Sequence, residues 1–250
     1  MLCIGIPAYN EAPTIGLVLW RIRKVFEEYP REYEILVLDD GSTDATAETL
    51  RPYTEVLPLT VLRHEERRGY AAALDTLIRA AARRTRYPRR DALVLMQGDF
   101  TDQPEHIPEL VKRFEGGADL VVAERPAASR LAPTAVRRLR RIAPWITRPF
   151  LRVPGVSDPF GTFRLYRIAV MRDVVKEAGE APIVHWSGWA ANVELLLAAA
   201  RAARRIETVP LDARYDLRPR ETRVRAVAGA MDLYRFGWAN RANRITTTTP

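Results

Sequence analysis

The ten residues MQGDFTDQPE, at 96–105, place polar side chains directly after the apolar run DALVL. Asp99 supplies a carboxylate, and carboxylate oxygens suit a Mg²⁺ or Mn²⁺ ion that bridges a diphosphate. Gln97 precedes it, and its amide carbonyl can coordinate the same ion while its NH₂ bonds a sugar hydroxyl. The stretch therefore predicts a metal and phosphate site with one charged ligand. The alternative is a polar turn stabilised by Asp99.

Two other loops carry acidic side chains after apolar runs. Asp39 and Asp40 follow YEILVL, and paired carboxylates can accept hydrogen bonds from a base NH and a ribose hydroxyl. Asn10 and Glu11 take the equivalent position after LCIGI, where a carboxylate also suits ribose. Together the two loops predict a nucleotide site.

The elements that must position these loops are short apolar runs alternating with longer amphipathic segments. Strands are expected at 2–6, 33–38, 59–63, 92–96 and 119–123, and helices at 14–28, 69–84 and 104–114. This alternation predicts an α/β fold with a mostly parallel sheet and helices on both faces. Ligands of such sheets bind at the carboxyl ends of the strands. The polar segments 7–11, 39–44, 97–102 and 124–125 should therefore meet at one edge.

Composition favours one large domain, because the chain has 250 residues and 47% apolar content. No stretch approaches the roughly 18–20 uninterrupted apolar residues that cross a bilayer, and no basic leader opens the chain, so a cytoplasmic protein is expected. Cys3 is the only cysteine and lies in an apolar run, which predicts a buried inert thiol. The three histidines have no metal-ligand spacing and are expected to be structural.

Basic residues are concentrated in one segment. Lys and Arg exceed Asp and Glu by 39 to 31, and residues 125–152 hold eight Arg and no acid. Leu139, Trp145 and Phe150 are interleaved with these arginines, a pattern that suits a helix on an anionic membrane surface. The alternative is a solvated helix face. Nucleic acid is not an expected partner, because no helix-turn-helix, zinc-finger or RNP-like pattern accompanies the segment.

Four sequence blocks resemble the donor half of the family 2 glycosyltransferases, which have a Rossmann-like GT-A fold. They are IPAYNE, LDDGSTD, GYAAAL and MQGDFTDQPEHIPEL, in order over roughly the first 125 residues. The resemblance is closest to the dolichol- and polyprenyl-phosphate mannose or glucose synthases, and GTFRLYR and VPLDARYDLRPRETR extend it. It implies a single domain at 1–245, with a nucleotide-sugar half at 1–125, an acceptor half at 126–245 that includes the basic amphipathic segment 130–152, and a disordered tail at 246–250.

Position by position, the resemblance implies roles for individual residues. The implied donor-binding residues are Pro7, Ala8, Tyr9, Asn10, Glu11, Asp39, Asp40, Gln97, Gly98 and Asp99. Asp99 would hold Mg²⁺ or Mn²⁺, with Gln97 as a neutral ligand and Thr101 as an auxiliary group. The implied phosphate-binding residues are Arg125, Arg138, Arg140, Arg164, Arg218 and Arg223, of which Arg125 would act in catalysis with Asp99.

The resemblance implies an inverting enzyme that moves a sugar from GDP-mannose or a UDP-sugar to a polyprenyl phosphate. It would contact the cytoplasmic face of an anionic membrane peripherally. A hydroxyl acceptor on a cell-surface glycan is the alternative, and Asp158 or Glu194 would then be the base. Gln97 replaces the first acidic residue of the family's DxD motif, so a non-catalytic nucleotide-sugar binder is a further alternative. Asp102 either compensates for the missing charge or caps the following helix.

Overall fold

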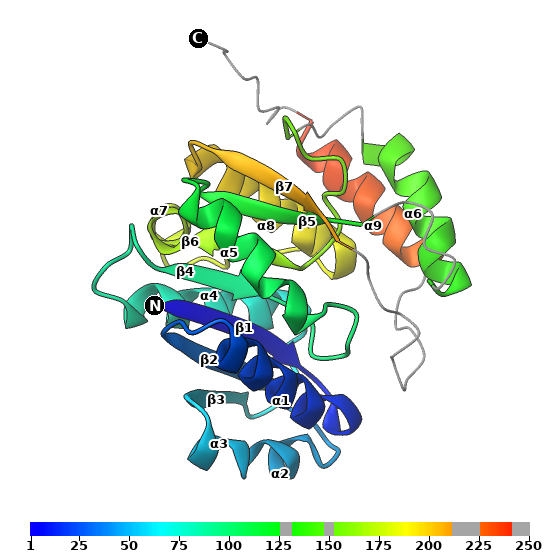
Figure 1. The fold of residues 1–250 in the computed structure, drawn as a ribbon. Helices are drawn as coiled ribbons and strands as arrows, with labels where there is room; N and C mark the ends of the chain where they lie inside the picture. Colours follow the sequence, from blue (N-terminus) through cyan, green and yellow to red (C-terminus); the bar gives the residue numbers. More distant parts are fainter. Residues whose placement is uncertain (126–131, 148–152, 212–225, 242–250) are drawn as a thin grey trace.

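A seven-stranded sheet runs through the computed structural model of the chain, which describes residues 1–125, 132–147, 153–211 and 226–241 (Figure 1). The strands, in the spatial order β3-β2-β1-β4-β6-β5-β7, are β1 (Leu2–Ala8), β2 (Tyr33–Asp40), β3 (Leu59–His64), β4 (Ala92–Leu95), β5 (Leu120–Glu124), β6 (Arg164–Arg167) and β7 (Ile206–Pro210). Neighbouring strands are parallel except that β6 runs antiparallel to both β4 and β5. The prediction of a mostly parallel sheet is confirmed.

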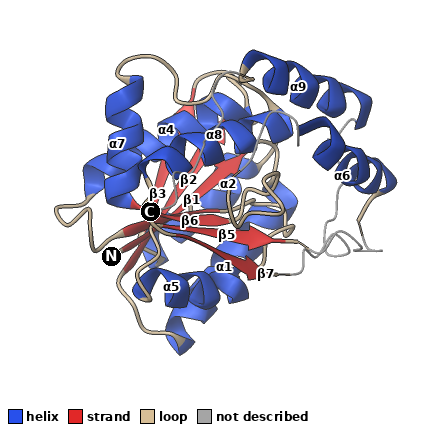
Figure 2. Cartoon of the chain, turned by 90° about the horizontal axis from the view of Figure 1, so that it is seen from above, coloured by secondary structure: helices blue, strands red, loops and turns tan. Residues whose placement is uncertain are grey.

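Helices connect and cover the strands. They are α1 (Ala12–Glu28), α2 (Thr46–Leu50), α3 (Tyr53–Val56), α4 (Tyr70–Arg84), the 3₁₀ turn η1 (Pro104–His106), α5 (Ile107–Glu115), α6 (Thr134–Thr147), α7 (Ile168–Ala178), α8 (Gly188–Ala202) and α9 (Ala226–Ala239). Figure 2 shows α1 and α5 on one face of the sheet and α4, α7 and α8 on the other. Within the described residues, none of these helices has the length and apolar character that a bilayer-spanning segment needs.

The apolar alternation along the strands divides the core into two layers. In β1, Leu2, Ile4 and Ile6 pack with α1 and α5, whereas Cys3 faces α4, α7 and α8. Burial raises the pKa of the Cys3 thiol to about 12, which agrees with the expected inert side chain. A third, smaller cluster joins α6 and α9 to α8 beyond the carboxyl ends of the strands.

Sequence periodicity locates most of these elements. Strands β1 to β5 each end within two residues of the predicted runs, and α1, α4 and η1 with α5 match the predicted helices equally well. The strand β6 and the helices α7 and α9 were not predicted. β6 has only four residues and carries arginine at both ends, Arg164 and Arg167, so it lacks the apolar run that marks the other strands.

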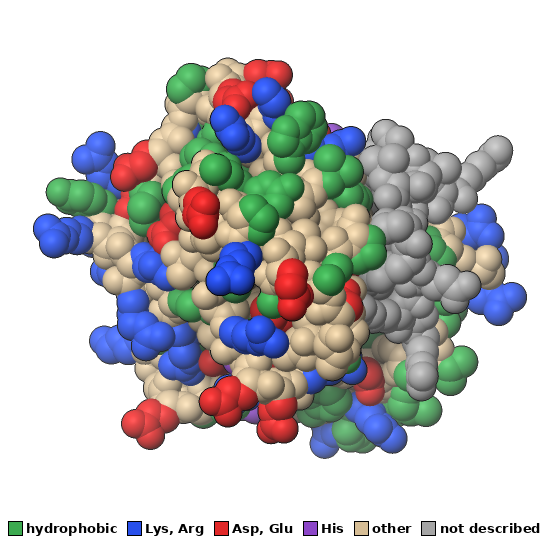
Figure 3. Space-filling view, turned by 90° about the horizontal axis from the view of Figure 1, so that it is seen from below, with side chains coloured by type: hydrophobic (Ala, Val, Ile, Leu, Met, Phe, Trp, Pro, Cys, Tyr) green, Lys and Arg blue, Asp and Glu red, His purple; other side chains and the backbone are tan. Residues whose placement is uncertain are grey.

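Charge is unevenly distributed over the surface. On the face seen in Figure 3, acidic and basic side chains are interspersed with hydrophobic ones. Helix α6 differs, because it contains four arginines and no acidic residue, and Arg137, Arg138 and Arg141 are exposed. The predicted helix within the basic segment is therefore present.

The turn after β2 brings two site loops close together. Gly41 has a φ of +64°, and a Cβ at this position would lie 2.5 Å from the main-chain carbon of Glu66 and 2.6 Å from the nitrogen of Arg67. Both the left-handed backbone and the contact with another loop therefore require glycine.

We expect Gly41→Ala to lower the free energy of unfolding by about 2–4 kcal/mol, from backbone strain and the forced displacement of the 64–69 loop. Gly155→Ala is the matched control. Gly155 has a φ of +77°, but the described residues leave its Cβ position open, so about 1–2 kcal/mol is expected from strain alone. Urea denaturation of both variants measures the difference, and equal losses would contradict the close contact at Gly41.

Candidate active site

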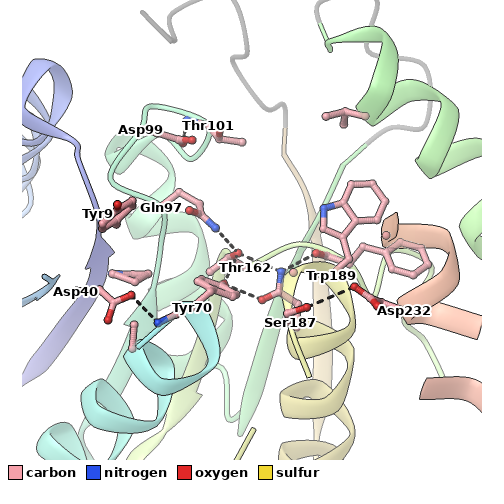
Figure 4. A pocket seen from close by; sticks show the side chains of 18 of the residues that line it. Tyr9, Asp40, Tyr70, Gln97, Asp99, Thr101, Thr162, Ser187, Trp189 and Asp232 are labelled. Atoms are coloured by element: carbon pink, nitrogen blue, oxygen red, sulfur yellow. Dashed lines mark hydrogen bonds between the residues drawn. The ribbon is translucent and has the colours of Figure 1, made fainter. Parts of the chain in front are cut away.

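A cavity of about 510 Å³ lies at the carboxyl ends of β1, β2 and β4, between the sheet and the helices α6, α8 and α9. Figure 4 shows Tyr9 and Asp40 on one side of it and Trp189 and Asp232 on the other. The predicted site residues that line it are Pro7, Ala8, Tyr9, Glu11, Asp40, Gln97, Asp99, Thr101 and Arg125. The polar loops thus meet at one edge, as the strand order requires.

The two aspartates after β2 have different positions. Asp40 lines the cavity, and its carboxylate accepts hydrogen bonds from the main-chain N–H groups of Arg68 (2.9 Å) and Gly69 (2.8 Å) and from His64 Nδ1 (2.7 Å). Asp39 is buried beside the cavity and accepts from the N–H of Ser42 at 2.9 Å. Asp40 is therefore the aspartate that a ligand can reach, and His64 holds it in place.

Two other predicted donor residues shape loops and do not line the cavity. Asn10 accepts from the N–H of Thr43 at 2.9 Å and ties the first loop to the second. A Cβ at Gly98 would lie 3.2 Å from Ile6 and 3.3 Å from Ile15, so the acidic loop packs closely on β1 and α1.

The 97–102 loop places the side-chain oxygens that could hold a metal ion at the cavity wall. Asp99 is buried and lines the cavity, and its Oδ1 accepts from the N–H of Thr101 at 3.0 Å. Gln97 lines the same cavity. No group of three or more His, Cys, Asp or Glu side chains able to hold a metal occurs among the described residues. These residues fit a Mg²⁺ or Mn²⁺ ion that takes its other ligands from phosphate and water, as Mg²⁺ commonly does.

Asp102 pairs with Arg125 at the cavity wall. Its carboxylate contacts Arg125 Nη2 and accepts from the N–H of Gln97 at 2.8 Å. Burial raises the pKa of the Asp102 carboxyl, and the Arg125 guanidinium opposes that shift. Asp102 therefore holds Arg125 and the start of the loop, and the expectation that it caps the following helix is wrong: the residue before η1 is Gln103.

The two arginines of α6 that were predicted to bind phosphate, Arg138 and Arg140, differ in their surroundings. Arg140 pairs with Asp158 at 3.0 Å, and its guanidinium lies 5.7 Å from the ring centroid of Trp189. Arg138 is exposed. Asp158 and Glu194, the bases expected for a hydroxyl acceptor, do not line the cavity; Glu194 accepts from the N–H groups at 185 and 186.

Arg164 lies away from the cavity, contrary to a direct role in phosphate binding. Its guanidinium is buried and donates to the main-chain oxygens of Asn192 and Pro159, both at 2.6 Å. It therefore fastens β6 to α8. The predicted phosphate ligands Arg218 and Arg223, and the predicted tail at 246–250, lie outside the described residues.

Several lining residues were not singled out from the sequence. Tyr70, Thr162, Trp189, Asn192 and Asp232 reach the cavity from the second half of the chain or from α4. Asn192 has a sequence signal, because it is one of only two polar residues in the apolar run WAANVELLLAAA, the other being Glu194. The others required knowledge of how β6, α8 and α9 pack.

Comparison with known proteins agrees with this geometry. The family model "Glycosyl transferase family 2" matches residues 3–175. The chain is 28% identical over 179 residues to dodecaprenyl-phosphate galacturonate synthase of Rhizobium johnstonii, covering 69% of this chain and 49% of the relative. It is 29% identical over 213 residues to bactoprenol glucosyl transferase of Shigella phage SfV, covering 81% and 64%. The chain thus spans 49% and 64% of the length of these two relatives.

Solved structures give the fold. The crystal structure of glucosyl-3-phosphoglycerate synthase from Mycobacterium tuberculosis in complex with Mn²⁺, UDP-glucose and phosphoglyceric acid superimposes with a TM-score of 0.68 and 18% identity, over 99% of this chain and 81% of that one. The architecture is the GT-A fold, as expected. With the match over residues 3–175, the chain belongs to glycosyl transferase family 2.

Proposed function

We propose that the chain transfers a sugar from a nucleoside-diphosphate sugar to a polyprenyl phosphate. The proposal rests on the lining of one cavity, which has carboxylates on one side and apolar side chains on the other. Asp40 and Asp99 lie on the sheet side, whereas Val136 and Leu139 of α6 add apolar surface on the other. The names of the two relatives give dodecaprenyl phosphate and bactoprenol as their lipids, which supports a polyprenyl acceptor here.

The residues that line the cavity would have different roles. Asp40 would accept hydrogen bonds from the nucleoside, and Asp99 would hold the Mg²⁺ or Mn²⁺ that neutralises the leaving diphosphate. Arg125 lies at the same wall and would bind the acceptor phosphate or the developing charge on the diphosphate. A polyprenyl phosphate oxygen is already ionised near neutral pH and needs no base. A hydroxyl acceptor would need a base, but Asp158 pairs with Arg140 and Glu194 accepts from the main-chain N–H of His185, both outside the cavity. A phosphate acceptor is therefore favoured over a hydroxyl.

Turnover tests the proposal. The protein is incubated with Mg²⁺ or Mn²⁺, a panel of UDP- and GDP-sugars, and polyprenyl phosphate, and both released nucleotide and glycosylated lipid are measured. We expect one donor to give lipid product, EDTA to abolish it, and Asp99→Asn to reduce it on the order of 100-fold. Asp173→Asn, on the exposed surface of α7, is the control and should match the wild type. Absence of product with every donor would contradict the proposal.

We also propose that α6 and α9 bring the cavity to an anionic membrane at its cytoplasmic face. Arg137, Arg138 and Arg141 are exposed on α6, together with Trp145. On α9, four exposed apolar side chains recur at helical spacing and form one stripe: Val227, Met231, Tyr234 and Trp238. Arginine beside exposed aromatic side chains suits the interface between headgroups and acyl chains.

Vesicle co-sedimentation tests this contact. Each arginine near an anionic surface contributes about 1 kcal/mol, so replacing Arg137, Arg138 and Arg141 by serine should weaken binding to phosphatidylglycerol vesicles about 100-fold. A control variant replaces three exposed arginines elsewhere by serine: Arg51, Arg83 and Arg86. Equal losses in the two triple variants would mean that net charge alone, rather than α6, determines binding.

A further inference from the structure

We infer that three side chains, Tyr70, Thr162 and Asn192, fix the amide of Gln97 in one orientation, with Nε2 directed at Thr162 and Oε1 presented to the donor. They are positioning residues for the proposed donor site, and the identity of the ligand rests on the proposed function. As a consequence, position 97 presents a neutral hydrogen-bond acceptor to the cavity, and a carboxylate at this position is unfavourable.

Strand pairing places the two ends of this network opposite each other. In the antiparallel pair β4–β6, Leu95 is the partner of Arg164. Continuing that register beyond the strand ends sets Gln97 across from Thr162, and Gln97 Nε2 lies 2.8 Å from Thr162 Oγ1 (Figure 4). The contact therefore follows from the sheet itself.

The first link fixes Asn192. Its Nδ2 lies 2.9 Å from the main-chain oxygen of Phe160, and a carbonyl oxygen only accepts hydrogen bonds. The NH₂ of Asn192 must therefore face Phe160, and Oδ1 must face the opposite way. Tyr70 OH lies 2.8 Å from that Oδ1, so the tyrosine donates its single proton to it.

The second link fixes Thr162. Its Oγ1 lies 2.9 Å from Tyr70 OH, whose proton is already used, so the threonine hydroxyl donates to the tyrosine oxygen. Burial raises the pKa of Tyr70 far above its ordinary value, so the tyrosine keeps its proton at neutral pH. Thr162 Oγ1 then has only lone pairs to offer Gln97. The NH₂ of Gln97 must face it, and a flipped amide would set two acceptors against each other.

The other face of Gln97 is directed to the ligand. Its main-chain N–H is held by Asp102 at 2.8 Å, and among the described residues none donates a hydrogen bond to Oε1. Gln97 lines the cavity with Asp99. The donor and its metal ion therefore meet one carboxylate and one neutral oxygen, the latter oriented by a main-chain carbonyl at position 160.

A double-mutant cycle at positions 97 and 70 tests the inference. Gln97→Glu keeps the side-chain length but puts a carboxylate oxygen against Thr162, so we expect kcat/KM for the donor to fall by about tenfold. Tyr70→Phe removes the acceptor of the Thr162 proton and frees that proton for a carboxylate. The double variant should therefore be more active and more stable to urea than Gln97→Glu alone, even though it has also lost the Tyr70 hydroxyl.

The hydroxyl at position 162 provides the control. Tyr70→Phe should fail to rescue Gln97→Glu when Thr162→Val is also present, and Thr162→Ser should lose less activity than Thr162→Val. Additive effects of Tyr70→Phe and Gln97→Glu, on both kcat/KM and stability, would overturn the inference. The stability cycle needs no substrate, so it stays decisive even if the wild type turns over no donor, which would instead defeat the proposed function.

Discussion

Parallel pairing of β1 with both β2 and β4 is the constraint on which the site depends. The register sets Ala8 beside Asp39 and Gly5 beside Leu95, so the loops that follow these strands leave the sheet at the same edge and on neighbouring positions. Each loop is then tied to another one: Asn10 to Thr43, and Asp40 to the turn after β3. The cavity is thus a product of strand order, with side chains fixed by cross-loop hydrogen bonds.

The antiparallel strand β6 joins the second half of the chain to that edge. Because it runs against β4, the residues that precede it lie beside the loop that follows β4. Two buried or half-buried arginines at this junction are each paired with an aspartate, Arg125 with Asp102 and Arg140 with Asp158. Such pairing offsets the cost of holding cations near the cavity, where we propose that a phosphate binds.

Sequence patterns predict the first half of the chain well and the second half poorly. Apolar runs bounded by polar loops define β1 to β5 and the sheet edge that carries the cavity, and most implied donor residues do line that cavity. The prediction fails where charge is buried: Arg164, implied as a phosphate ligand, anchors α8 through main-chain oxygens. It also fails at Thr162 and Asp232, since their position depends on how separate elements pack. Local periodicity carries no information of that kind.

We propose that this edge of the sheet binds a metal-bound nucleoside diphosphate with one carboxylate ligand. A crystal structure with Mn²⁺ and UDP or GDP, read by the anomalous signal of manganese, tests it most directly. We expect an ion about 2.0–2.3 Å from the Asp99 carboxylate, with the diphosphate on the ion and the nucleoside beside Asp40. A nucleotide bound elsewhere, or an ion without contact to Asp99, would contradict the claim.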